Sequence, residues 1–129
     1  MQENEITEKI IGLAFKVHTV LGPGLLESIY EKCLAYELKA AGFTVEVQKP
    51  IAIQYNEINF DEGFRADIIV NDTVILELKA IKQFEDVHFK QLLTYLKLSG
   101  KKLGLLINFN EASLKNGIRR IVNSANFKI

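Results

Sequence analysis

Apolar residues recur at helical spacing in two stretches near the amino terminus. Residues 5–20 are predicted to form a helix with Asn4 as its N-cap, and Gly22-Pro23-Gly24 then breaks the chain. A second helix is predicted from residue 25 to about 41, ending at Gly42. Because apolar side chains cover most of its circumference, we expect this second helix to pack on more than one side.

Short runs of β-branched and aromatic residues follow the second helix. Residues 43–47 and 51–55 are predicted as strands on either side of Pro50, and residues 58–60 continue the meander. Two further strands are expected between Phe64 and Lys79, joined by a turn at Asn71-Asp72.

The remaining pattern completes one α/β domain. Residues 86–99 are predicted as a helix closed by Gly100, and residues 103–107 as a short buried strand. Residues 114–122 fit either a helix or a strand. This order predicts a single domain over residues 1–129, with helices packed on one mixed sheet. The strands at 74–79 and 103–107 are joined by a helical crossover, so we expect them to be parallel.

Charged residues interrupt the aliphatic hairpin. Charges are rarely buried unless they are paired or bind a metal, yet Asp67, Glu77 and Lys79 lie within its strands. Glu77 and Lys79 share one face of their strand. A two-residue turn at Asn71-Asp72 would pair Asp67 with Leu76 and send the two carboxylates to opposite faces, whereas an odd-length loop or a bulge pairs Asp67 with Glu77.

These two registers predict different functions for the hairpin. In the first, the charges belong to a solvated strand face. In the second, two carboxylates crowd together, and a shared proton or a divalent cation relieves their repulsion. Oxygen ligands favour Mg²⁺, Mn²⁺ or Ca²⁺ over zinc.

Other polar side chains are candidates to join such a site. Glu27 lies at the margin of the apolar surface of the second helix, where it either reaches the sheet or pairs with a lysine. Tyr30, one turn further on, either orients Glu27 or packs in the core. Residues three and four apart share one face of a helix. His88, Gln91 and Tyr95 have this spacing, and together they suit recognition or the positioning of a water. A lone helical histidine is also a common surface group.

Composition limits the class of protein. The chain has 129 residues, 48% hydrophobic and 25% charged, which are ordinary values for one folded domain. Its only cysteine, Cys33, excludes an internal disulfide and a cysteine-rich zinc site, and is expected to be a small core residue. Neither a signal-peptide pattern nor an apolar run of roughly 20 residues is present, so we expect a cytoplasmic protein without a membrane span.

Charge gives only local support for a nucleic-acid partner. The formal net charge is zero, so there is no global electrostatic attraction to phosphates. The last third of the chain has a local positive bias from Lys101, Lys102, Lys115, Arg119, Arg120 and Lys128. Such residues either contact phosphates or are solvated surface groups.

Several motifs together resemble a known family. The stretch GLLESIY, residues 24–30, matches the signature of the GxxExxY protein family. Further stretches similar to that family follow in the same order: FRADIIV, VILELKA, HFKQLLTYLKLSG and LGLLINF. The resemblance covers roughly residues 6–122, and the family is placed in the PD-(D/E)XK nuclease-like superfamily. It implies a restriction-endonuclease-like core, a central mixed sheet flanked by helices, here with an extra N-terminal helix.

The resemblance also implies a metal site. In the superfamily, an aspartate on the second core strand and Glu-x-Lys on the third bind Mg²⁺ and position water for phosphodiester hydrolysis. Asp67, Glu77 and Lys79 stand at the matching positions. The backbone carbonyl of Leu78 is implied as a further ligand. Ala66 stands where the superfamily's name has a proline.

Other residues match the superfamily's supporting positions. Glu27 matches an acidic residue of the first core helix, which would bind the metal directly or through water, and Gln91 matches a glutamine of the later helix. Supporting roles are expected for Tyr30, His88 and Tyr95, and phosphate contacts for Arg119 and Arg120.

The function expected from the resemblance is nuclease activity that depends on Mg²⁺ or Mn²⁺. The substrate would be DNA, favoured over RNA, and a homodimer or partner subunit would complete substrate binding because no recognition appendage is apparent. The alternative is a non-catalytic nucleic-acid-binding or regulatory module with the same fold, which the zero net charge favours. An enzyme acting on small phosphates is a third possibility, but no phosphate-cradling glycine loop is present.

Overall fold

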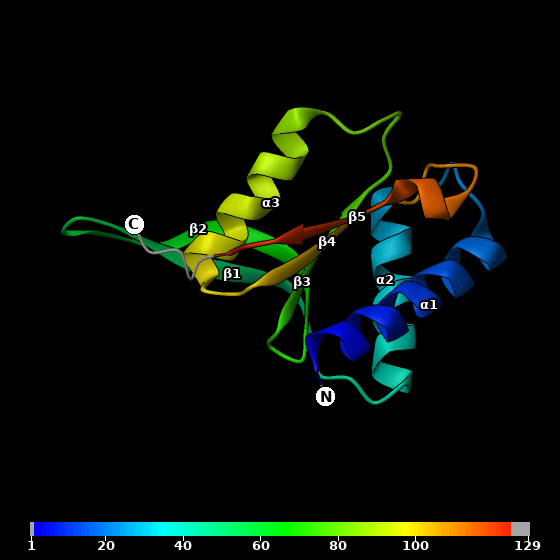
Figure 1. The fold of residues 1–129 in the computed structure, drawn as a ribbon, viewed down its shortest axis with the longest axis horizontal. Helices are drawn as coiled ribbons and strands as arrows, with labels where there is room; N and C mark the ends of the chain where they lie inside the picture. The colour runs from blue at the N-terminus through cyan, green and yellow to red at the C-terminus, as the bar shows by residue number, and fades with distance from the viewer. Residues whose placement is uncertain (1, 125–129) are drawn as a thin grey trace.

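The computed structural model describes residues 2–124, and its elements follow the expected order (Figure 1). They are α1 (Glu3–Leu21), α2 (Glu27–Ala40), β1 (Val45–Tyr55), β2 (Ile58–Val70), β3 (Val74–Lys79), α3 (Asp86–Ser99), β4 (Leu103–Asn108), the 3₁₀ turn η1 (Leu114–Gly117) and β5 (Ile118–Val122). The strands form one sheet in the order β1-β2-β3-β4-β5. β3 and β4 are parallel, as their crossover predicts, and the other pairs are antiparallel. The predicted α/β architecture is therefore confirmed.

Helices cover both faces of the sheet (Figure 1). On one face, α1 and α2 pack against Ile68, Leu76 and other aliphatic side chains of the strands. On the opposite face, Leu92 and Leu96 of α3 pack against Ile75 and its neighbours. The central strands are therefore apolar on both faces, as expected for strands buried between two helical layers.

Some predicted boundaries were wrong. Gln2, rather than Asn4, caps α1 and forms a reciprocal capping box with it. The two segments predicted at 43–47 and 51–55 form one continuous strand, β1, which begins at Val45 and runs through Pro50. β1 pairs only with β2 and is an edge strand, where a residue without an N–H group is tolerated. Residues 114–122, which fitted a helix or a strand, form η1 followed by β5.

The β1–β2 ladder extends well beyond β3. It continues to the pair Tyr55–Ile58, whereas β2 pairs with β3 only over residues 68–70. The outer part of this hairpin projects from the body of the molecule (Figure 1). β2 therefore leaves β3 at Asp67. Within residues 2–124, none of the helices is long and apolar enough to cross a membrane.

Candidate active site

The loop between β2 and β3 contains three residues, 71–73, instead of a two-residue turn. Ile68 pairs with Leu76 on either side of it. Continuing this register places Asp67 opposite Glu77. The odd-length loop that a shared site requires is therefore confirmed.

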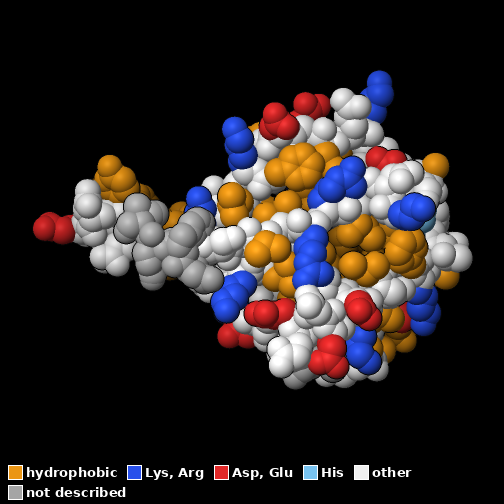
Figure 2. Space-filling model, in the orientation of Figure 1, with side chains coloured by type: hydrophobic (Ala, Val, Ile, Leu, Met, Phe, Trp, Pro, Cys, Tyr) orange, Lys and Arg blue, Asp and Glu red, His pale blue; other side chains and the backbone are white. Residues whose placement is uncertain are grey.

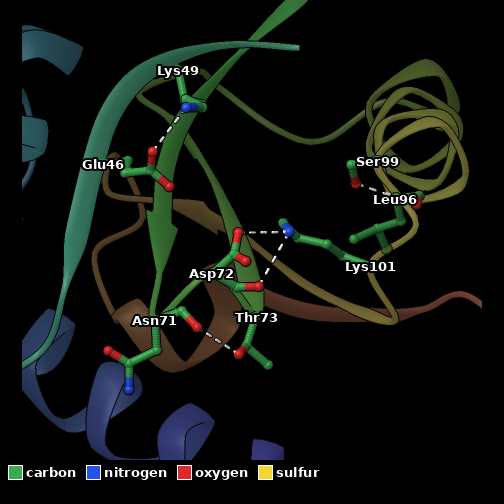
Figure 3. A network of polar contacts seen from close by, with 8 residues as sticks. All are labelled: Glu46, Lys49, Asn71, Asp72, Thr73, Leu96, Ser99 and Lys101. Atoms are coloured by element: carbon green, nitrogen blue, oxygen red, sulfur yellow. Dashed lines mark hydrogen bonds and ion pairs between the residues drawn. The ribbon is translucent and has the colours of Figure 1, made fainter. Parts of the chain in front are cut away.

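Polar contacts hold this loop in place (Figure 3). The ammonium group of Lys101 donates to the backbone carbonyl of Asp72 at 3.1 Å and to its carboxylate at 3.0 Å. The Thr73 hydroxyl donates to the Asn71 carbonyl at 2.7 Å. Asn71 and Asp72 both have left-handed backbone, with φ of 52° and 53°, which Asn and Asp adopt more readily than most residues. The Asn-Asp-Thr sequence thus fits the loop that sets the strand register.

Beyond Ile68 the two strands part, and two carboxylates fill the gap. The Leu78 N–H donates to Oδ2 of Asp67 at 2.9 Å, and the Asp67 N–H donates to Oε1 of Glu77 at 3.4 Å. Ala66 packs with the α3 cluster and Ile68 with the α1–α2 cluster, although regular alternation would place both on one face. β2 is therefore irregular at Asp67, and side chains satisfy backbone groups that the neighbouring strand does not.

The environment disfavours ionising both carboxylates. Glu77 is only 7% exposed. Burial, and then the charge of Asp67, raise the pKa of Glu77 to about 8, against the opposing effects of the Asp67 N–H and Lys79. Burial also raises the pKa of Asp67, while hydrogen bonds from Leu78 and Gln48 and the charge of Lys79 oppose the shift. A cation between these groups would relieve the strain of holding two charges there.

Lys79 and Glu27 border the two central carboxylates. The charge of Lys79 opposes the upward pKa shift of Asp67, Glu77 and Glu27 alike, so its ammonium group lies within electrostatic range of all three carboxyl groups. Glu27 is the first residue of α2. Burial of its carboxyl group, followed by the charge of Asp67, raises its pKa. Glu27, on α2, thus belongs to the same electrostatic cluster as the strand residues Asp67, Glu77 and Lys79.

The donor set fits a hard divalent cation in an open site. Leu78 directs its N–H toward Asp67, so its carbonyl faces the same gap, because both groups of a strand residue point to one side. Mg²⁺ is commonly bound by one or two carboxylates, with water and substrate phosphates completing its coordination. Residues 2–124 contain no group of three acidic, histidine or cysteine side chains placed to hold a metal ion. The convergence of Glu27 with Asp67 and Glu77 as three direct ligands is therefore not observed.

Tyr30 packs in the core and holds the turn before α2. Its hydroxyl donates to the Gly22 carbonyl at 2.6 Å and accepts from the Leu25 N–H at 3.1 Å. The ring is fully buried and stacks on Phe109, with centroids 4.6 Å apart. The tyrosine of the GLLESIY stretch therefore places the start of α2, and with it Glu27.

Replacing Tyr30 with phenylalanine is expected to lower the free energy of unfolding by about 1–3 kcal/mol, because the turn before α2 loses both of its hydrogen bonds to the hydroxyl. Urea denaturation measures this loss. Tyr36→Phe is the matched control, since that side chain is 70% exposed and its change should be close to zero. Equal stability of the two variants would contradict the assigned role.

The polar residues His88, Gln91 and Tyr95, which share one face of α3, do not act together. The Glu85 N–H donates to Nδ1 of His88 at 2.9 Å, so His88 caps the start of α3. Tyr95 stacks on Phe64 with centroids 3.9 Å apart. Burial, and then the charges of Glu77 and Asp67, raise the pKa of Tyr95, so its hydroxyl lies within electrostatic range of both carboxylates. Gln91 is exposed on the same helix, and no hydrogen bond within residues 2–124 joins it to either carboxylate.

The predicted basic cluster is not a single surface. Arg119 lies over the Phe84 ring, 5.6 Å from its centroid, whereas Arg120 donates to the side chain of Asn4 on α1. Successive strand residues face opposite sides of a sheet, which separates these two arginines. Lys128 lies outside the described residues. On the face drawn in Figure 2, basic side chains are scattered among acidic and apolar groups.

Sequence reasoning missed two residues of the cluster. Glu31 lies one helical turn after Glu27, a spacing that gave a usable signal. Burial, and then the charge of Asp67, raise the pKa of Glu31, while a hydrogen bond donated by Gln48 and the charge of Lys32 oppose the shift. Gln48 lies in β1 and gave no signal, because its left-handed backbone is not expected of a glutamine.

These features define a nuclease-like α/β class: a mixed sheet with an aspartate on one strand and Glu-x-Lys on the next. The chain matches the family model of the PD-(D/E)XK nuclease superfamily over residues 4–121 and belongs to that superfamily. No curated protein and no solved structure gives a significant match.

Proposed function

We propose that this protein is a nuclease that hydrolyses phosphodiester bonds of DNA, or of RNA, with the help of Mg²⁺ or Mn²⁺. The observation that carries the proposal is the gap between β2 and β3, where Asp67 and Glu77 meet beside Lys79. Membership of the PD-(D/E)XK nuclease superfamily supports the same chemistry.

Each residue of the gap has a role that follows from its place. Asp67, Glu77 and the Leu78 carbonyl would hold the cation, which supplies charge neutralisation at a phosphate oxygen and activation of water. The Lys79 ammonium group stabilises negative charge that develops on the phosphate or positions the attacking water. Glu27, at the rim, orients a water, and Tyr95 borders the pair from the α3 side. Gln91 is a supporting group that a bound substrate would engage.

The start of α2 supports the finer resemblance to the GxxExxY family. The glutamate of the GLLESIY stretch joins the electrostatic cluster, and the tyrosine tethers the preceding turn. The scattered basic side chains provide no continuous phosphate-binding surface on the face of Figure 2. A second copy of the chain or a partner subunit would therefore complete substrate binding, with Arg119 and Arg120 as candidate phosphate contacts.

Metal titration of cleavage tests the proposal. End-labelled single-stranded, duplex and branched DNA, with an RNA of matched sequence, are incubated with protein and increasing Mg²⁺ or Mn²⁺. We expect cleavage that rises with the metal and is abolished by EDTA. Nucleic-acid binding without cleavage in any metal would favour a non-catalytic module. Absence of both binding and cleavage would refute the proposed function.

A further inference from the structure

Gln48 has an unusual backbone conformation for its place in a strand. β1 pairs with β2 regularly on either side of it, at Val47–Ile68 and Lys49–Ala66, which places Gln48 opposite Asp67. Its φ is 52°, a left-handed value that costs about 1–2 kcal/mol for most residues. The other non-glycine residues with positive φ within residues 2–124 are asparagines or aspartates in loops between paired strands: Asn56, Asn71 and Asp72.

The side chain of Gln48 joins two carboxylates from different elements. Its amide nitrogen donates to Oε2 of Glu31 at 2.6 Å and to Oδ1 of Asp67 at 3.3 Å. Ionised carboxylates accept hydrogen bonds only, so the amide NH₂ is the group that suits both neighbours. Gln48 thus connects α2 to β2 through two carboxylates that would otherwise repel one another.

This contact completes the hydrogen bonding of Asp67. The Leu78 N–H holds Oδ2 and the Gln48 amide holds Oδ1, so each carboxylate oxygen has a donor from a different strand. Groups that orient a ligand carboxylate influence metal affinity although they do not touch the ion. Strained backbone persists where surrounding contacts require it, and such residues cluster at functional sites.

We propose that Gln48 is a positioning residue that orients the Asp67 carboxylate for metal binding and fastens it to α2 through Glu31. Its left-handed backbone is retained because this conformation directs the amide toward Asp67 and Glu31. The inference rests on the proposed metal site and adds a residue that acts through Asp67.

Two substitutions separate the side chain from the backbone. Gln48→Gly suits a positive φ and removes the amide, while Gln48→Asn tolerates the same φ but carries an amide one methylene shorter. We expect both variants to bind Mn²⁺ about 10-fold or more weakly in calorimetric titration and to lose about 10–100-fold in kcat, with KM for nucleic acid little changed. Their Tm should stay within about 5 °C of wild type. Asn56→Gly, at the distant hairpin loop, is the control and should match wild type in every readout.

The outcomes distinguish this inference from the proposed function. Wild-type Mn²⁺ affinity in Gln48→Gly, or an affinity loss that occurs only with a large fall in Tm, would overturn the positioning role. If wild type binds Mn²⁺ but cleaves nothing, the nuclease proposal fails while the affinities still decide the role of Gln48. If wild type binds no Mn²⁺, the metal site fails and the role of Gln48 fails with it.

Discussion

Replacing Glu77 with glutamine is expected to make the metal-free protein more stable than wild type, by a margin that grows as the pH rises. Burial and the charge of Asp67 raise the pKa of Glu77 in the folded protein to about 8, from an ordinary value of 4.5. Between these values the unfolded chain is ionised while the folded protein keeps its proton, so folding stability falls as the pH increases. From pH 5 to pH 9, the stability advantage of Glu77→Gln should grow by about 4 kcal/mol. Urea denaturation at both pH values, in EDTA, measures it.

Glu57→Gln is the matched control for this experiment. Glu57 is an exposed residue at the β1–β2 loop, and the same substitution there should leave the pH dependence of stability unchanged. Subtracting the wild-type profile removes the contribution of the histidines, which are common to all three proteins. A pH-independent difference between Glu77→Gln and wild type would contradict the assigned burial and charge repulsion. The same variant should lose metal-dependent cleavage, since a neutral amide is a poor ligand for Mg²⁺.

Replacing Lys79 with methionine is expected to abolish most turnover while leaving metal binding in place. The charge of the ammonium group acts on Asp67, Glu77 and Glu27, where it opposes the upward shift of each pKa. Loss of one group that stabilises transition-state charge typically costs about 10²–10³-fold in kcat. Mn²⁺ affinity should be equal or higher, because a positive charge beside the cation has been removed. Single-turnover cleavage and calorimetric titration of Mn²⁺ give the two values.

Lys97→Met provides the control for Lys79→Met. Lys97 is exposed in the last turn of α3, so the same substitution should change neither cleavage nor Mn²⁺ binding. A kcat of Lys79→Met close to that of wild type would exclude the proposed role of the ammonium group. A loss of Mn²⁺ binding together with turnover would show instead that Lys79 maintains the site's structure.

The helices and strands with a clear apolar period could be predicted from sequence, because the apolar pattern and the residues that end each element indicate the same bounds. The helix at 86–99 was predicted with the observed bounds, since its apolar stripe is followed by Gly100 in the left-handed conformation. The Pro50 prediction failed for a topological reason: a proline interrupts most strands but is compatible with the edge position of β1. Edge position depends on the whole sheet and cannot be read from neighbouring residues.

The residues of the site could be predicted from sequence, but their arrangement depended on the register of the β2–β3 hairpin. Spacing alone left Asp67 and Glu77 on the same or opposite faces, and the third loop residue, Thr73, decided between them. The part played by Gln48 could not be foreseen, because nothing in its identity predicts a left-handed backbone inside a strand. For His88, the spacing on the helix suggested a role beside Tyr95, with which it shares a face. A local capping contact instead determines where its ring points.

The most direct test of the central claim compares cleavage of a labelled duplex in Mg²⁺ by wild type, Asp67→Asn and Asp61→Asn. Asn at position 67 keeps an acceptor for the Leu78 N–H but removes the charge, and Asp61 is an exposed aspartate of the same strand. We expect Asp67→Asn to lose about 10²–10³-fold or more in rate and Asp61→Asn to cleave like wild type. Equal cleavage by wild type and Asp67→Asn would contradict the assignment of the metal site to the gap between β2 and β3.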